Sequence, residues 1–213
     1  SLLRNPYFSV VLSVVYVLTR VSAIVGQPIG VFPDSPSYLR LSFTGDAERM
    51  WPVPAVFSAL QTDGTRILAN VAIGCVIWIF MAFTLAQQSR YPRSVFAVVL
   101  LLGLSPQVIR YDLALLSESL GISFAIFLVI SSIRIAKERT TPNLVMWIVA
   151  FVLCVMTRPT HLIIVGMCVL VSTVVFVQSR GKRMVFATPA LILLLVWGYA
   201  TVNNNRSVSI LNM

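Results

Sequence analysis

The stretch RILANVAIGCVIWIFMAFTLA, residues 66–86, decides the fold, because the 20 residues after its first arginine carry no charge. A helix that crosses a bilayer needs about 20 largely apolar residues, and a length of about 17 to 25 is tolerated. Seven stretches fit this description, although the third and the fifth are short: 7–26, 66–86, 94–108, 113–133, 143–158, 161–178 and 184–202. The sequence therefore predicts an all-α polytopic membrane protein. We expect residues 1–213 to form a single module of about seven transmembrane helices, with a long, partly helical first outer loop at 27–65.

The composition favours the same class. Hydrophobic residues make up 58% of the 213 and charged residues 11%, with a mean hydropathy of +0.90, whereas a soluble domain carries about 25% charged residues. The excess of Lys and Arg over Asp and Glu lies in short loops and forms no contiguous basic face, so we expect membrane lipids as partners and no nucleic acid. The three cysteines lie inside apolar segments without a CxxC motif, which gives no support for a disulfide or a zinc site. Arg20 interrupts the first apolar run, so that run is interpreted as a retained span and not a signal peptide.

The connections between the spans alternate in charge. One set holds nine basic residues and one acid: Arg4, Arg90, Arg93, Arg134, Lys137, Arg139, Arg180, Lys182 and Arg183, with Glu138. The other set holds both signs of charge: the remaining six acids, Asp34, Asp46, Glu48, Asp63, Asp112 and Glu118, and six arginines, Arg40, Arg49, Arg66, Arg110, Arg158 and Arg206. Because cytoplasmic loops carry an excess of Lys and Arg, the sequence predicts a multi-pass cell-membrane protein with a cytoplasmic N-terminus. The acidic connections and the C-terminus would lie on the non-cytoplasmic side.

The first outer loop, 27–65, is the only long connection, which makes it the first place to look for function. It contains FPDSPSYL, residues 32–39. Asp34 stands between two prolines that stiffen the backbone, and Ser35 and Tyr38 add hydroxyl groups within one turn. Asp34 is either a functional carboxylate or the cap of a helix that begins near Ser35. The two roles are compatible, since a cap position leaves one carboxylate oxygen free.

The second half of this loop mixes charged and apolar residues between 47 and 60. Pro52 and Pro54 would interrupt a long helix there. We expect a short interfacial element that lies on the membrane, with Trp51 at the level of the headgroups.

A second polar cluster brackets the third and fourth spans. Arg110 and Asp112 lie in the outer turn, and Glu118 lies about six residues into the fourth span. An unpaired carboxylate at that depth is costly, so we expect Glu118 to pair with Arg110, Arg158 or Arg20. Such a pair would be part of a functional site or a structural lock between helices.

A third cluster, TRPTH at 157–161, follows the fifth span. Arg158 presents a planar fork of donors that suits a phosphate group and stays charged. His161 is the only histidine, and a lone histidine is more often structural than catalytic, but beside Arg158 it is a second candidate phosphate contact. The chain contains no GxSxG, HExxH or P-loop motif.

In this order, the three clusters resemble the motifs of the GT-C superfamily of integral-membrane glycosyltransferases. The matching pieces are DSPSYL at 34–39, LSESL at 116–120 and TRPT at 157–160. Members of that superfamily transfer sugars from polyprenyl-phosphate donors on the non-cytoplasmic face. Their shared module of seven spans with a long first outer loop would cover nearly the whole chain.

The resemblance implies a role for each matching residue. Asp34 would be the catalytic base, which takes a proton from the acceptor hydroxyl as that oxygen attacks the anomeric carbon with inversion. The lipid phosphate would be the leaving group, so cations that neutralise it would lower the barrier. Arg158, Arg110 and His161 would fill that role.

The remaining candidates follow from the same resemblance. Ser35 and Tyr38 would contact the substrate, and Glu118 would orient the acceptor or one of the arginines. No cofactor is certain. Asp46 and Glu48 would add either a second acidic contact or the ligands of a divalent cation, which some members of the superfamily use. Family members usually continue into further spans or a soluble domain that recognises the acceptor, so we expect a partner subunit or a missing C-terminal region.

Two other functions remain open from the sequence. A transporter or lipid-handling protein would use Glu118, Arg20 and Arg158 to line a path, although transporters favour internal repeats and charges near the membrane midplane, and neither is evident in the sequence. A non-catalytic subunit of a larger assembly is the other alternative. The sequence identifies neither the sugar nor the acceptor.

Overall fold

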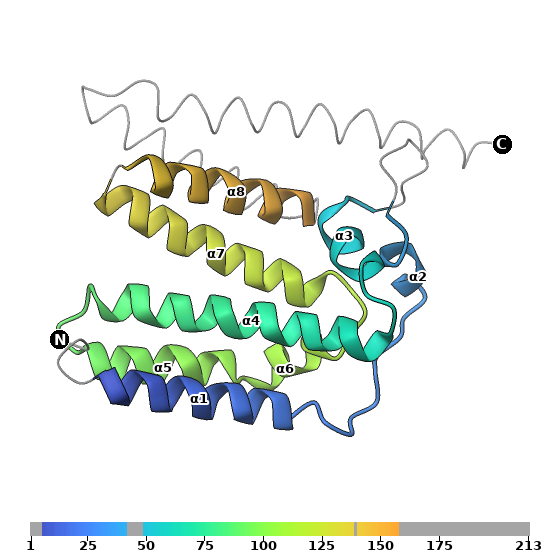
Figure 1. Ribbon diagram of the computed structural model, residues 1–213, viewed down its shortest axis with the longest axis horizontal. Helices are drawn as coiled ribbons and strands as arrows, with labels where there is room; N and C mark the ends of the chain where they lie inside the picture. Colours follow the sequence, from blue (N-terminus) through green and yellow to red (C-terminus); the bar gives the residue numbers. More distant parts are fainter. Residues whose placement is uncertain (1–5, 42–48, 139, 158–213) are drawn as a thin grey trace.

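The computed structural model describes residues 6–41, 49–138 and 140–157, and the regular structure of this part is helical (Figure 1). Its helices are α1 (Pro6–Ser22), α2 (Ser35–Tyr38), α3 (Pro52–Ser58), α4 (Asp63–Ala86), α5 (Pro92–Gly103), α6 (Pro106–Asp112), α7 (Glu118–Lys137) and α8 (Thr141–Thr157). Among the described residues no strand is formed, apart from one isolated parallel bridge between Gly30 and Ala114. The predicted all-α class is confirmed for this part of the chain.

Two helices, α4 and α7, are long and apolar enough to cross a membrane, and the bent pair α5–α6 makes a third if it is one span. Helices α1 and α8 are apolar but shorter, at 17 residues each. These elements overlap the first five predicted spans. The predicted spans at 161–178 and 184–202 lie outside the described residues, so the total of about seven stays a prediction.

The third predicted span, 94–108, is broken at a proline. Helix α5 ends at Gly103, and α6 continues at an angle of 51° to it. Ser105, between them, has an extended backbone with φ −58° and ψ 142°, because a residue that precedes proline avoids the helical region. Pro106 then starts α6, where its missing N–H leaves no hydrogen bond unmade. The apolar stretch is therefore short because the helix bends at Pro106.

The longer helices lie side by side, with α4 between α5 and α7 (Figure 1). Helix α8 packs on the other side of α7, and α1 contacts both α4 and α5. The short helices α2 and α3 lie together at one end of this array, where α3 contacts α4 and α8. These helix directions decide which loops share an end of the molecule.

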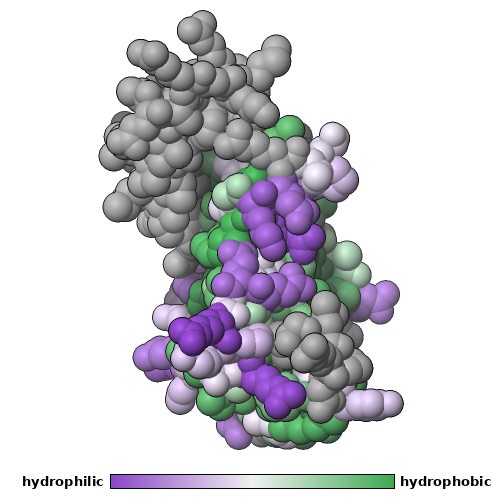
Figure 2. Space-filling view, turned by 90° about the vertical axis from the view of Figure 1, so that its left-hand side faces the viewer, coloured by the Kyte–Doolittle hydropathy of each residue, from purple (hydrophilic) through white to green (hydrophobic). Residues whose placement is uncertain are grey.

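The two sets of connections lie at opposite ends of the molecule. The end that carries α2 and α3 is called the acidic end, and its described acids are Asp34, Asp63, Asp112 and Glu118. The opposite end is called the basic end, and its described cations are Arg90, Arg93, Arg134 and Lys137. Figure 2 looks onto the basic end, where hydrophilic side chains gather over an apolar body. That this end faces the cytoplasm stays a prediction.

Two apolar clusters hold the helices together. One joins α1, α4 and α5 around Trp78 and Phe96. The other joins α3 to α7 and α8 around Phe57, Leu120 and Phe151, of which Phe57 is fully buried. The expected interfacial element thus forms α3, whose apolar side chains pack into the protein. Its position at the membrane surface stays a prediction.

The outer face of α1 remains apolar and uncovered by the described residues. Val10, Val11, Val14 and Leu18 are each more than half exposed on this face. An apolar surface of this kind marks contact with a membrane or with another protein. It agrees with the length and the apolar composition of α4 and α7.

Candidate functional site

The loop that leads into α2 presents Asp34 to solvent. Asp34 occupies the N-cap position of α2 with a helical backbone, and its side chain makes no cap hydrogen bond. Its carboxylate is 66% exposed, and its Oδ2 lies 2.9 Å from Nη2 of Arg49. The predicted cap role is therefore met in position but not in bonding, because the carboxylate is directed to an arginine instead of to the helix.

Arg49 connects this acid to the rest of α2. Its Nε donates a hydrogen bond of 2.9 Å to Oγ of Ser37, and its guanidinium lies 4.9 Å from the centroid of the Tyr38 ring. Arg49 is one of the arginines of the outer connections and is not among the predicted site residues. No spacing rule links residues 34 and 49 across a loop, so only the opposite charges of the two side chains could have suggested the pair.

Ser35 and Tyr38, predicted to contact substrate, make hydrogen bonds inside the protein. Oγ of Ser35 accepts a 2.9 Å hydrogen bond from the backbone N–H of Phe32, and the Tyr38 hydroxyl lies 3.3 Å from Oγ of Ser117. Both side chains are buried. In this arrangement they fix the shape of the Asp34 loop and anchor it to the start of α7.

Glu118 lies beside that anchor. It is the first residue of α7, directly after Ser117, and its Oε2 is buried. The prediction that Glu118 lies six residues into a helix is wrong, because residues 113–117 are not helical. A carboxylate in the first turn of a helix is stabilised by the positive end of the helix dipole. The short link from Tyr38 to Ser117 places α2 and this helix start in one region of the acidic end.

A buried ion pair between α1 and α6 lies next to the start of α7. Nε of Arg20 on α1 lies 2.8 Å from Oδ2 of Asp112 on α6, and the two side chains are 1% and 0% exposed. Nη2 of Arg20 also donates to Oδ1 of Asp112, over 3.1 Å, so the pair is bidentate. Sequence analysis named Arg20 as one of three candidate partners for Glu118, but the structure pairs Arg20 with Asp112.

Polar neighbours complete this pair. Ser119 on α7 donates a 2.7 Å hydrogen bond to Oδ1 of Asp112, and Nη1 of Arg20 donates to the hydroxyl of Tyr16. The Asn70 amide on α4 donates to the backbone carbonyls of Asp112 and Ala114, over 3.3 and 3.5 Å. A buried charge pair is tolerated when its remaining hydrogen-bonding capacity is satisfied in this way. The cluster therefore joins four helices at the acidic end.

The same cluster is connected to the Asp34 loop through backbone hydrogen bonds. Gly30 donates to the carbonyl of Leu113 over 2.9 Å and accepts from the N–H of Leu115 over 3.0 Å. The segment with these two groups follows Asp112 directly. The buried pair thus holds residues 113–115, and these residues hold the loop that carries Asp34.

The other predicted site residues are only partly placed. Arg110 is exposed on α6 at the acidic end. The other four lie outside the described residues: Asp46, Glu48, Arg158 and His161. Within residues 6–41, 49–138 and 140–157, no three His, Cys, Asp or Glu side chains form a group that could hold a metal ion. The described part therefore brings together the loop of Asp34, Tyr38 and the start of α7, with Arg49 as an addition.

Comparison of the chain with known protein families, with curated proteins and with solved structures found no match.

Proposed function

We propose that the chain is a membrane glycosyltransferase of the GT-C type, which moves a sugar from a polyprenyl-phosphate donor to an acceptor on the non-cytoplasmic face. The observation that carries the proposal is the contrast between two acids of the acidic end. Asp112 is fully buried and bound to Arg20, whereas Asp34 is 66% exposed. The loop of Asp34 is held in place by the hydrogen bonds of Ser35 and Tyr38. An exposed carboxylate on a fixed backbone can reach a substrate.

The proposed reaction assigns one step to Asp34. Its carboxylate accepts the proton of the acceptor hydroxyl while that oxygen forms a bond to the anomeric carbon. The bond between the anomeric carbon and the lipid phosphate oxygen breaks, and the phosphate leaves with the electron pair. Arg49 and Arg110 are two of the described cations at this end, and they would stabilise the leaving phosphate. Arg158 and His161 would add to them.

The surroundings of Asp34 suit a lipid-borne donor. Val31 and Phe32, just before it in the loop, are 64% and 45% exposed, and Val25 is 70% exposed. A polyprenyl chain could lie against this apolar surface while its phosphate reaches the arginines. This neighbourhood supports a lipid-linked sugar over a soluble sugar nucleotide as the donor.

The test is the Asp34→Asn variant, assayed for transfer from a polyprenyl-phosphate sugar by purified protein. We expect a loss of about 10²- to 10⁴-fold in the transfer rate, because asparagine keeps the shape but cannot accept the proton. The control is Asp63→Asn, since Asp63 is also partly exposed at the acidic end and is paired with a neighbouring arginine, Arg66. Full activity of Asp34→Asn would rule out Asp34 as the base.

A non-catalytic membrane subunit is the second candidate, and the ion pair of Asp34 with Arg49 favours it. In a subunit of this kind, the ion pair between Asp34 and Arg49 would stabilise the loop, and Asp34 would take no part in a reaction. The unmutated chain would then be inactive alone, and Asp34→Asn would change its stability but not the activity of a reconstituted assembly. A transport path through Arg20 finds less support, because Arg20 is buried in its ion pair with Asp112.

A further inference from the structure

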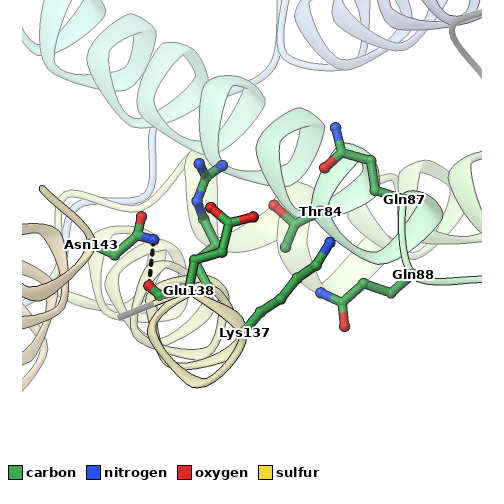
Figure 3. Close-up of a pocket in the computed structure, with 7 residues that line it drawn as sticks. Thr84, Gln87, Gln88, Lys137, Glu138 and Asn143 are labelled. Atoms are coloured by element: carbon green, nitrogen blue, oxygen red, sulfur yellow. Dashed lines mark hydrogen bonds between the residues drawn. The ribbon is translucent and has the colours of Figure 1, made fainter. Parts of the chain in front are cut away.

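We propose that a pocket between α4 and α7 at the basic end binds the phosphate of an anionic phospholipid headgroup (Figure 3). The pocket lies at the end of the molecule opposite to Asp34. Its volume is about 50 Å³. One water molecule needs about 10–15 Å³, so the pocket accommodates a group of a few heavy atoms, such as a phosphate.

Two cations line this pocket from the last turn of α7. Arg134 is half-buried, and its guanidinium lies 5.3 Å from the centroid of the Phe80 ring, which restricts its orientation. Lys137 is exposed, and Figure 3 shows its side chain extended toward α4. Glu138 is the single acid in the lining. The lining therefore has a net positive charge and suits an anion.

Uncharged donors on α4 complete the chemistry. Thr84 is 5% exposed, and its Oγ1 is buried without a hydrogen-bond partner among the described residues. A buried hydroxyl without a partner costs free energy, and a phosphate oxygen would supply the missing partner. Gln87 and Gln88 add exposed amide groups at the rim. On the α8 side, the Asn143 amide donates over 2.8 Å to the backbone carbonyl of Glu138, which fixes that wall (Figure 3).

The position of the pocket favours a lipid over a free anion. It opens at one end of the apolar helices, and Tyr7 and Tyr91 are 79% and 65% exposed at the same end. Tyrosine gathers at the level of the lipid headgroups. Arg90 and Arg93 add exposed positive charge at this end. Basic pockets between membrane helices on the cytoplasmic side are typical sites for anionic headgroups.

The experiment measures lipid bound to the purified full chain in detergent by native mass spectrometry, with phosphatidylglycerol and phosphatidylcholine supplied in equal amounts. We expect phosphatidylglycerol to be preferred. Each Lys or Arg near an anionic surface contributes enough for about a 5-fold change in binding, so Arg134→Gln with Lys137→Gln should weaken phosphatidylglycerol binding about 30-fold. Glu138→Gln should strengthen it, and Thr84→Val, which removes the buried hydroxyl, should weaken it several-fold.

The matched control is Arg93→Gln, because Arg93 lies at the same end with its guanidinium over Phe8 and outside the pocket lining. A loss as large in Arg93→Gln as in the double variant would overturn the pocket, since diffuse charge would then explain the binding. Equal occupancy by both lipids, or competition by inorganic phosphate at the concentration of the lipid, would overturn the lipid headgroup as ligand. Lys137→Gln alone, at an exposed position, keeps the test decisive if the Arg134 variant does not fold. No readout depends on sugar transfer.

Discussion

At the residue scale, Asp112 and Asp34 are two carboxylates at the same end of the molecule that differ in burial. Asp112 is buried in an ion pair, whereas Asp34 is exposed. Asp112→Asn should destabilise the protein by about 3–5 kcal/mol, because it leaves the guanidinium of Arg20 buried without its counter-charge. The measurement is the thermal unfolding of the purified chain in detergent. Asp63→Asn is the control, and its partly exposed pair with Arg66 should be worth about 1 kcal/mol or less.

The same comparison has an internal check. Replacement of both partners, as Arg20→Met with Asp112→Leu, should cost less than Asp112→Asn alone, because no charge is then left buried. An equal loss from the double variant and from Asp112→Asn would contradict the importance of the charge pair and would attribute the effect to packing.

The sequence predicts which charged residues belong to the site but not which of them pair with one another. Sequence reasoning singled out Asp34, Arg20 and Glu118, because charged side chains next to apolar spans are costly and need a reason. It could not find the partner of Arg20, since Arg20 and Asp112 are 92 residues apart in the sequence. Only helix packing brings them together.

At the element scale, the apolar periods predicted the positions of the helices but not all of their ends. The break in the third span follows from Pro106, and proline rules anticipate it. The late start of α7 at Glu118 does not follow, because residues 113–117 are apolar enough to belong to a span. Backbone hydrogen bonds between Gly30 and residues 113–115 hold that segment outside the helix, and the local sequence does not predict such a long-range contact.

The packing of α1 on α4 depends on a glycine. A Cβ at Gly74 would lie 2.5 Å from Nη2 of Arg20, which its bonds to Asp112 hold in place, whereas a Cβ at Gly64 would meet nothing within 4 Å. Gly74→Ala should therefore destabilise the protein by about 1–3 kcal/mol. Gly64→Ala, in the first turn of the same helix, should be neutral or stabilising. Thermal unfolding compares the two, and an equal response would show that Arg20 moves aside without loss.

At the scale of the whole molecule, the helix directions turn a sequence pattern into a polarity. Four of the five described acids, Asp34, Asp63, Asp112 and Glu118, lie at the end with α2 and α3, whereas Arg90, Arg93, Arg134 and Lys137 lie with Glu138 at the other end (Figures 1 and 2). The positive-inside rule then predicts that the basic end faces the cytoplasm. Both the proposed transfer at Asp34 and the proposed headgroup site at Lys137 depend on the two ends facing opposite sides.

Cysteine labelling tests this polarity. In a variant without Cys75, Cys154 and Cys168, Ser58→Cys should react with a membrane-impermeant maleimide added to intact cells, because position 58 is exposed at the acidic end. Lys137→Cys should react only after the membrane is permeabilised, and that reaction is the control for its accessibility. Labelling in the reverse pattern would place Asp34 in the cytoplasm and contradict transfer on the outer face. Labelling of both positions from outside would contradict a membrane between the two ends, and with it the division of the molecule into a substrate side and a lipid-anchoring side.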